Sequence, residues 1–321
     1  PAWMAVESRL FSFIAAPTND IFRLYYTRFY IICQQEGRSI LKSYVIGPND
    51  AGQRLDKFLR KAAPRLPASL LYRAIRQKDI KINGARCQPG DKLQAGDTVR
   101  VYLPDDVLST DDSLLFLAAP PVVEVVYEDD QILLCNKPQG LLVHEDDSST
   151  PDTLINRILH YLYQKGEWDP QKENSFTPAL CNRIDRNTGG IVIAAKTFEA
   201  LQIISEKIRL REIDKYYLCI VHGNPTPKSG TLKGYHVKDA ANNTVTISAK
   251  PVPGAKIALT RYRVLEDWKD KSLLEVELLT GRTHQIRAQL AAIGHPLWGD
   301  AKYGNSRENA RLGNRQALWA Y

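Results

Sequence analysis

Two stretches of alternating apolar and polar residues predict a small β-sheet early in the chain. Residues 79–84 (DIKING) alternate and end in Asn-Gly, a dipeptide that favours a two-residue hairpin turn. Residues 98–103 (TVRVYL) alternate again, directly after Gly96-Asp97. We expect both stretches to belong to one compact domain, spanning residues 44–103.

Helical spacing accounts for much of the remainder of this segment. The run 54–59 (RLDKFL) predicts the start of an amphipathic helix, and Pro64 and Pro67 predict a turn after it. A second helix should follow, capped by Ser69 or a neighbour, with an apolar side that comprises Leu70, Ala74 and Ile75. The segment is therefore predicted to be a small α+β domain.

A larger domain is predicted from residue 122 to residue 321. Residues 122–127 and 132–136 have the composition of strands, and residues 198–209 have that of a helix. Many short strands with a few helices between them are typical of a mixed α+β domain on a largely antiparallel sheet. Residues 104–121, which carry an acidic cluster and end in two prolines, are predicted to be a linker.

Residues 1–43 form an extension to which we assign no function. Its stretch 21–32 (IFRLYYTRFYII) has no clean period, and fits either a strand pair or an amphipathic helix. No run anywhere approaches 18 consecutive apolar residues, so no membrane span is expected. The 5 cysteines form no C-x-x-C pair, which argues against a disulfide framework or zinc site and favours a reducing cytoplasm.

Positive charge is concentrated in one short part of the chain. The net charge is +7, and residues 52–103 alone hold 12 Lys and Arg against 4 Asp and Glu, an excess of 8. The remaining chain holds 31 basic and 32 acidic residues. This asymmetry favours a polyanion-binding module joined to a nearly neutral body, although a merely solvated face is the alternative.

The run 183–190 (RIDRNTGG) is the first candidate for chemistry. In an extended chain Arg183 and Asp185 point to one side while Ile184 faces the core, and the two glycines allow a tight turn into the next strand. A carboxylate between guanidinium groups would be ionised at neutral pH, as a nucleophile or base requires. A structural salt bridge at a turn is the alternative.

The run 280–287 (TGRTHQIR) is the second candidate. Thr283 is predicted to cap a helix that ends at Gly294 and whose inward side comprises Ile286, Leu290 and Ile293. The first turns carry four polar side chains, those of Arg282, His284, Gln285 and Arg287. Such a cluster attracts a phosphate or a carboxylate, although an exposed polar helix end is the alternative.

The third candidate is Tyr217, in the predicted strand 215–221 (KYYLCIV). Its ring would line a pocket with the hydroxyl accessible. The alternative is that Tyr217 is a core residue whose hydroxyl is merely hydrated, which is the more common situation for a tyrosine in a strand.

Two known families resemble these motifs. The run 52–103 resembles an S4 RNA-binding domain in its RLDKFL, IKING and GD-x-V pieces, which occur in that order. From about Glu124 onward the chain resembles the catalytic domain of the RluA-type pseudouridine synthases. This second resemblance is carried by NKP at 136–138, RIDRNTGG at 183–190, KYY at 215–217, GRTHQIR at 281–287, and GHPLWGD followed by Tyr-Gly at 294–304.

The resemblance implies roles for individual residues. Asp185 corresponds to the catalytic aspartate, Tyr217 to the tyrosine beside the target base, and Arg287 to the arginine that pairs with the aspartate. Arg183 would occupy the gap that the flipped base leaves. The further residues expected to contact RNA are Arg54, Lys57, Arg73, Arg76, Lys78, Arg282 and His284.

Some positions depart from the family pattern. Asn182 stands where His is common, Ile184 replaces Leu, and Gly189 replaces the usual Ser. The chain also ends shortly after RQAL at 315–318, where similar enzymes continue, so we expect it to be truncated at its C-terminus. None of these differences touches the expected catalytic groups.

The implied activity is the isomerisation of uridines in structured RNA, with 23S ribosomal RNA as the expected substrate and transfer RNA as the alternative. The reaction breaks the N-glycosidic bond, turns the uracil and rejoins it through carbon 5. Asp185 would attack carbon 1′ or remove the 2′ proton, and Tyr217 would stack on the base or relay a proton. The sequence contains no phosphate-binding loop or dinucleotide fingerprint, and we expect neither a cofactor nor a metal.

We expect the chain to be a cytoplasmic monomer whose partner is RNA. Two other functions remain open from the sequence. One is a non-catalytic RNA-binding factor for ribosome assembly that uses the S4 segment alone. The other is a metal-independent RNA hydrolase built on Asp185, although such an enzyme would need a paired general acid nearby.

Overall fold

A computed structural model describes residues 42–108, 114–145, 150–239, 242, 244–304, 309 and 315–321. The stretch 21–32, predicted as a strand pair or helix, lies outside the described residues. The chain divides into two compact units, with boundaries after residues 46, 51 and 110, and residues 47–51 belong to the second unit. Each unit is described by itself below.

The first unit contains an antiparallel sheet in the order β1-β4-β2-β3. Its strands are β1 (Lys42–Val45), β2 (Ile80–Ile82), β3 (Ala85–Arg86) and β4 (Thr98–Val101). Asn83 and Gly84 both have positive φ, at 51° and 78°, as a type I′ turn requires, so the predicted hairpin is confirmed. β1 begins at Lys42, two residues before the domain start drawn from the sequence.

Two helices, α3 (Leu55–Ala62) and α4 (Ala68–Arg76), pack against this sheet through apolar faces. The predicted cap at Ser69 is wrong, because the N-cap is Pro67 and Ser69 lies inside the first turn. This start also changes which residues face inward. The buried residues of α4 are Leu71, Ala74 and Ile75, whereas Leu70 is only half-buried.

The second unit is built on a ten-stranded sheet in the order β11-β10-β12-β13-β9-β14-β8-β6-β5, with β7 paired to β8. The strands are β5 (Val125–Glu128), β6 (Ile132–Lys137), β7 (Ala179–Leu180), β8 (Gly189–Ala195), β9 (Tyr216–His222), β10 (Ser229–Asp239), β11 (Thr244–Ser248), β12 (Lys256–Asp267), β13 (Lys271–Leu278) and β14 (Leu318–Ala320). Among the described strands only the β8–β14 pair is parallel, which confirms the predicted α+β class with a largely antiparallel sheet.

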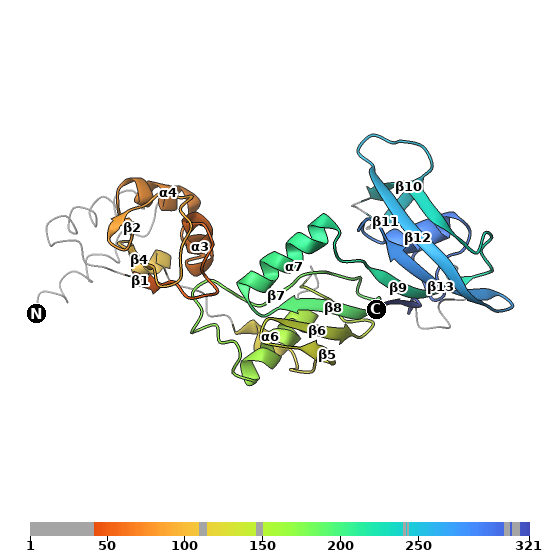
Figure 1. Ribbon diagram of the computed structural model, residues 1–321, viewed down its shortest axis with the longest axis horizontal. Helices are drawn as coiled ribbons and strands as arrows, with labels where there is room; N and C mark the ends of the chain where they lie inside the picture. The colour runs from red at the N-terminus through yellow and green to blue at the C-terminus, as the bar shows by residue number, and fades with distance from the viewer. Residues whose placement is uncertain are drawn as a thin grey trace, which may run out of the picture. The chain divides into compact units, whose positions relative to one another are not determined.

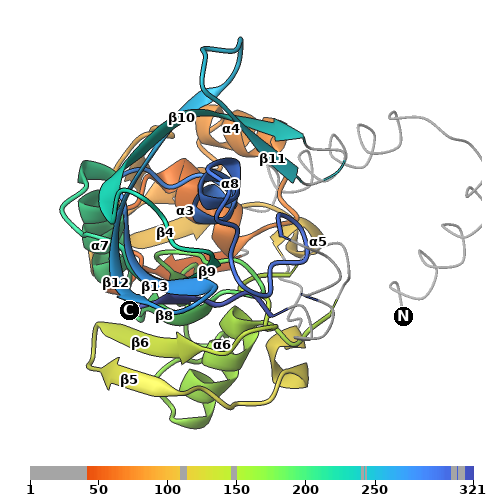
Figure 2. The same ribbon diagram turned by 90° about the vertical axis from the view of Figure 1, so that its right-hand side faces the viewer.

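Three helices accompany this sheet: α6 (Leu154–Gln164), α7 (Phe198–Leu210) and α8 (Gln285–Ala292). Figure 1 shows α6 and α7 beside β5, β6 and β8. In Figure 2, α8 lies within the curve formed by β10 to β13, which agrees with its contacts to β10, β11 and β12. The predicted helix 198–209 is confirmed, and Thr197 caps it by accepting a hydrogen bond from the Ala200 backbone N–H.

The segment predicted as a linker contains two short helical turns, α5 (Asp105–Leu108) and the 3₁₀ turn η1 (Leu115–Ala118). Phe116 of η1 is buried, and its ring centroid lies 5.3 Å from that of Trp168. Residues around Phe116 therefore contribute to the core of the second unit.

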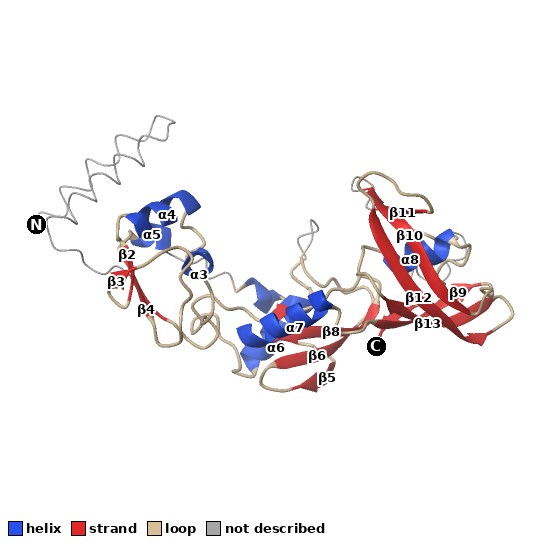
Figure 3. Ribbon diagram, turned by 45° about the horizontal axis from the view of Figure 1, so that its top comes forward, coloured by secondary structure: helices blue, strands red, loops and turns tan. Residues whose placement is uncertain are grey.

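The secondary-structure colouring in Figure 3 shows α6, α7 and α8 against the strands of the second unit. None of the helices in the described ranges has both the length and the apolar character needed to cross a membrane.

Strand β14 joins the two halves of the large sheet. It pairs with β9 on one side and with β8 on the other, so residues near the end of the chain lie in the middle of the sheet. Gly190 has φ of 110°, and a Cβ there would lie 2.0 Å from the Ala320 carbonyl oxygen. A glycine is required at this position, because β14 approaches the start of β8 so closely.

Candidate active site

Asp185 lies on the loop between β7 and β8, where two contacts set its direction. Ile184 is buried in the core, so the side chain of Asp185 points the other way and is 30% exposed. The Asp185 carbonyl accepts a hydrogen bond from the Thr188 N–H at 3.0 Å, which closes a tight turn. The predicted inward Ile184 and the turn into β8 are both confirmed.

Thr188 ties this turn to the segment that leads into β14. Its hydroxyl accepts a hydrogen bond from Gln316 Nε2 at 2.8 Å, and both side chains are buried. The Gln316 carbonyl in turn accepts from Gln139 Nε2 at 2.6 Å. The loop of Asp185 is therefore held from one side by residues about 130 positions later in the chain.

Lys137 holds the same loop from the other side. This lysine is fully buried, and its ammonium group donates to the carbonyl oxygens of Pro138, Leu141 and Arg186, each at 2.9 Å. Because Arg186 follows Asp185 directly, the ammonium group fixes the backbone beside the carboxylate. Burial lowers the pKa of Lys137 to about 8, and the charge of Asp185 partly opposes this shift.

Arg287, on α8, is the cation that meets Asp185. Its Nη1 donates to Asp185 Oδ2 at 3.1 Å, while its Nε and Nη2 donate to the two oxygens of Asp300 at 2.7 and 2.9 Å. Burial disfavours the charged guanidinium, but the two carboxylates outweigh this effect and raise the pKa of Arg287. The guanidinium is therefore shared between one accessible and one buried carboxylate.

Tyr217, on β9, is buried in the core of the second unit and is paired across the sheet with Val276 and Ala320. Burial raises its pKa to about 12, and the charge of Asp185 adds to the shift. The tyrosine is thus neutral at physiological pH and close enough to Asp185 to sense its charge. Asp185 and Arg287 meet from separate elements, and Tyr217, on a third, lies near enough for the charge of Asp185 to raise its pKa.

Comparison with known proteins shows to which families the two parts of the chain are similar. The family model for RNA pseudouridylate synthase matches residues 131–292, and the model for the S4 domain matches residues 53–99. The chain belongs to the RNA pseudouridylate synthase family. It is therefore an isomerase that forms pseudouridine in RNA, and it carries an S4 RNA-binding domain.

Curated relatives cover most of this pseudouridine synthase. The ribosomal large subunit pseudouridine synthase D of Neisseria meningitidis is 32% identical over 84% of this chain and 71% of its own length. The ribosomal large subunit pseudouridine synthase C of Vibrio cholerae is 32% identical over 81% and 79%. Human RNA pseudouridylate synthase domain containing 1 shares the fold, at 23% identity and a TM-score of 0.52 over 66% of this chain and 80% of its own.

A second layer of residues surrounds Arg287 in this pseudouridine synthase. Asp300 is 1% exposed, and its Oδ1 also accepts from the backbone N–H groups of Lys302 and Tyr303 at 2.9 and 3.2 Å. Burial opposes ionisation of Asp300, but the hydrogen bonds and charge of Arg287 outweigh it and keep its pKa below the usual value. The ring of Tyr303 lies 5.1 Å from the Arg287 guanidinium.

His284 connects Tyr303 to Asp185. Its Nδ1 lies 2.9 Å from the Tyr303 hydroxyl, and its Nε2 lies 3.8 Å from Asp185 Oδ2. Burial is the largest cause of its lowered pKa, which favours a neutral imidazole. His284 also has φ of 50°, an uncommon left-handed conformation for a residue other than glycine.

The start of α8 differs from the prediction. Thr283 is not the cap, because His284 occupies the N-cap position and makes no side-chain cap hydrogen bond. The Gln285 side chain instead organises this end by accepting from the Arg282 N–H at 3.1 Å and the Thr280 hydroxyl at 2.8 Å. Ile293, predicted inward, is 42% exposed because α8 ends at Ala292 and the chain turns at Gly294.

The residues predicted to contact RNA lie in different settings. Arg183 is exposed beside Ile184, whereas Arg282 is half-buried and its Nε donates to the Ile257 carbonyl at 3.3 Å. In the first unit Arg54 forms a two-bonded ion pair with Asp56. Exposed side chains in that unit include the predicted contacts Lys57, Arg73, Arg76 and Lys78.

Sequence reasoning missed Lys137, Asp300 and Tyr303 as site residues. All three stand in motifs that carried the family resemblance, NKP and the segment GHPLWGD with its following Tyr-Gly. These motifs could have pointed to the three residues, but only the fold shows which atoms their side chains contact. Among the described residues, no three His, Cys, Asp or Glu side chains converge as they would around a metal ion.

Proposed function

We propose that Asp185 is the catalytic carboxylate of this pseudouridine synthase, assisted by Tyr217 and Arg287. The observation that carries the proposal is the setting of Asp185. Its Oδ2 is held by Arg287, whereas no described residue donates a hydrogen bond to its Oδ1. A partly exposed carboxylate that is held through one oxygen can present the other to a ribose.

Arg287 and Asp300 tune the charge of that carboxylate. One guanidinium charge is divided between two carboxylates, so the group of three carries a net charge of −1. Asp300 also fixes the guanidinium by two parallel hydrogen bonds, an arrangement with high geometric specificity. We assign Asp300 as a positioning residue that holds Arg287 and leaves Asp185 reactive.

This setting supports the following chemistry. The uridine leaves its stack and enters the site, at a cost of a few kcal/mol. Asp185 either attacks carbon 1′ or removes the 2′ proton, the bond from carbon 1′ to nitrogen 1 breaks, and the uracil turns. Carbon 5 then bonds to carbon 1′; on the first route this breaks the bond between Asp185 and carbon 1′, and on the second route Asp185 returns the proton to carbon 2′. The proton lost from carbon 5 balances the proton gained at nitrogen 1. Tyr217, neutral at physiological pH, packs beside the base and can relay this proton.

We further propose that the substrate is ribosomal RNA of the large subunit and that the enzyme works in the cytoplasm as a monomer without a metal. The names of the two bacterial relatives support the substrate. The site supports the monomer, because Asp185, Tyr217, Arg287 and Asp300 come from one chain.

A direct experiment uses large-subunit ribosomal RNA, transcribed with uridine tritiated at carbon 5. We expect release of tritium without strand cleavage, in the presence of a chelator, and at defined positions that chemical mapping of pseudouridine would locate. Transfer RNA treated in the same way serves as the comparison. Release from transfer RNA alone would overturn the proposed substrate, and strand cleavage would support the hydrolase instead.

A further inference from the structure

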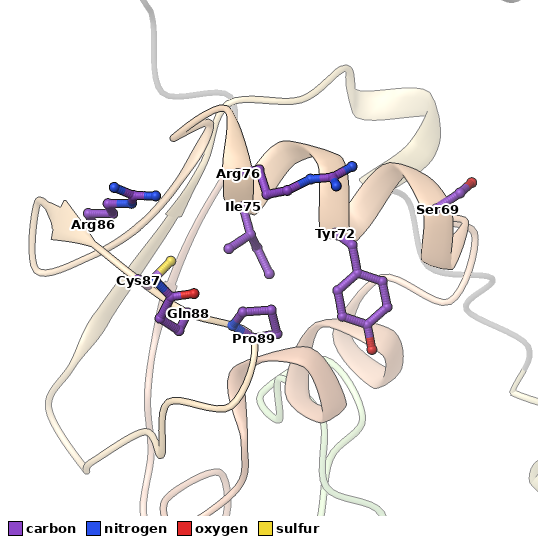
Figure 4. A pocket seen from close by; sticks show the side chains of 8 residues that line it. All are labelled: Ser69, Tyr72, Ile75, Arg76, Arg86, Cys87, Gln88 and Pro89. Carbon is purple, nitrogen blue, oxygen red and sulfur yellow. The ribbon is translucent and has the colours of Figure 1, made fainter.

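The first unit, which contains the S4 domain and is called the S4 unit below, has a pocket that no step of the proposed chemistry uses. It lies between α4 and the segment that follows β3, and has a volume of about 490 Å³. Figure 4 shows Tyr72 and Ile75 projecting from α4, with Gln88 and Pro89 facing them from the other side. Arg76 stands on the α4 side of the pocket and Arg86 on the β3 side.

The floor of this pocket is apolar and its rim is basic. Ile75 and Cys87 are only 2% and 3% exposed, so the floor is sealed by the core of the unit. The side chains of Arg76 and Arg86 are exposed, and no described carboxylate forms an ion pair with either. A ligand with a flat apolar part and a negatively charged part would match both features.

Tyr72 is held in place before any ligand arrives. Its hydroxyl donates to Asp56 Oδ2 at 3.2 Å, and Asp56 is itself fixed by two hydrogen bonds from Arg54 at 3.1 and 2.8 Å. Tyr72 nevertheless remains 39% exposed as a residue. An aromatic face that is fixed but accessible is suited to stacking, because little side-chain entropy is lost on binding.

We propose that this pocket binds one unstacked nucleotide of the RNA, with its base on Tyr72 and its phosphates near Arg76 and Arg86. A base inside a continuous duplex is covered on both faces and cannot enter, whereas a base extruded from a bulge or loop can. The carboxamide of Gln88 lies at the same rim and can contact a base edge. This inference rests on the RNA-binding function above and adds a preference for a bulged or looped RNA.

The test measures binding of the full chain to two RNAs, a duplex with one bulged nucleotide and the same duplex fully paired. We expect the wild type to prefer the bulged RNA about tenfold, which corresponds to about 1.4 kcal/mol. Tyr72→Leu should lose this preference and leave affinity for the paired duplex within about twofold. With 2-aminopurine as the bulged base, quenching by the wild type should disappear in the variant.

Matched variants separate this role from general effects on charge and folding. Tyr102→Leu removes a tyrosine from the same unit outside the pocket, and should keep the preference. Tyr72→Trp retains an aromatic face and should rescue it. Arg76→Ala should weaken binding of the bulged RNA more than that of the paired RNA, whereas Arg60→Ala should weaken both equally, since Arg60 is exposed and outside the pocket.

Equal affinity of the wild type for the two RNAs, or a Tyr72→Leu variant that weakens both equally, would overturn the pocket assignment. Neither result would touch the proposed chemistry, which is read separately as tritium release from carbon 5 at saturating enzyme. Loss of that release in the wild type would instead refute the catalytic proposal. The two failures are therefore distinguishable.

Discussion

Arg287 donates two hydrogen bonds to the buried Asp300 and one to the accessible Asp185. This division explains how a buried guanidinium, 10% exposed in its side chain, is stabilised while Asp185, the carboxylate that we propose to be catalytic, keeps its negative charge. If Asp185 were its only partner, the pair would be neutral and the carboxylate would be a weaker nucleophile and base. Asp300 therefore contributes to the site although it does not reach the substrate.

Asp300→Asn should slow turnover about 10- to 100-fold, because Arg287 would then neutralise Asp185 alone and would lose a firm anchor. Replacing one charge-assisted hydrogen bond should also cost about 2–3 kcal/mol of unfolding free energy. Single-turnover kinetics and urea unfolding of the same preparation measure both effects. A destabilised variant with the wild-type rate would show that Asp300 is structural only.

The control for this variant is Asp152→Asn. Asp152 receives the same fork of two hydrogen bonds from Arg157, at 2.6 and 2.8 Å, but it is 41% exposed and is not part of the site. Because exposed pairs contribute little, we expect a loss of less than about 1 kcal/mol and an unchanged rate. A slow Asp152→Asn variant would indicate that the assay reports general stability.

Asp185→Asn should abolish pseudouridine formation while the protein stays folded and binds RNA. The change removes the negative charge but keeps the shape, and Arg287 keeps both bonds to Asp300, so the cost in unfolding free energy should stay near 1 kcal/mol. Melting temperature, RNA affinity and tritium release are measured together. Any turnover well above background would remove Asp185 from the mechanism.

The sequence predicted those features of the fold and of the site that rest on local patterns. Ile184 faces inward and the Asn83-Gly84 hairpin forms, because strand alternation and turn conformation depend on neighbouring residues. The roles of Asp185, Tyr217 and Arg287 came from the family resemblance. Their convergence required the whole sheet, since Arg287 lies 102 residues beyond Asp185.

The predictions that failed concern helix starts and contacts between distant segments. Ser69 and Thr283 are good capping residues, yet Pro67 and His284 occupy the cap positions, and neither helix has a side-chain cap hydrogen bond. Asp300 could not be placed from the sequence, since its partner depends on how the turn after α8 folds back onto that helix. Strand β14 was not predicted to enter the middle of the sheet, because a pairing with β8 and β9 is non-local.

Tyr217→Phe should slow turnover while RNA affinity is preserved. The ring would remain packed in the core, but the hydroxyl that can relay a proton would be gone. A positioned general acid or base contributes about 10²- to 10⁴-fold, so a loss within or below that range is expected at saturating enzyme. Tyr262→Phe is a suitable control, because Tyr262 lies on β12 of the same sheet and its hydroxyl donates to the Pro227 carbonyl in a loop. Equal rates in wild type and Tyr217→Phe would leave the hydroxyl without a chemical role.

The burial of Lys137 should make the free energy of unfolding depend on pH. Its pKa in the folded protein is about 8, below the ordinary lysine value of 10.5, because burial disfavours the charge. Between these two values the unfolded chain binds more protons than the folded one, so this group makes the folded state more stable as pH rises from about 8 to 10.5. Below pH 8 the contribution of Lys137 to the free energy of unfolding is constant, and it destabilises the fold.

Lys137→Met removes this titration and also the three hydrogen bonds that hold the loop of Asp185. Relative to the variant, the wild type should therefore gain about 1–3 kcal/mol of unfolding free energy between pH 7.5 and pH 10. Urea unfolding of both proteins at the two pH values measures the difference, in which other titrating groups cancel. The variant should also turn over more slowly at pH 7.5, since the backbone at Arg186 is no longer fixed beside the carboxylate. If the stability difference between the two proteins is independent of pH, the ammonium group keeps its ordinary proton affinity in the fold, and the three carbonyl oxygens fully offset its burial.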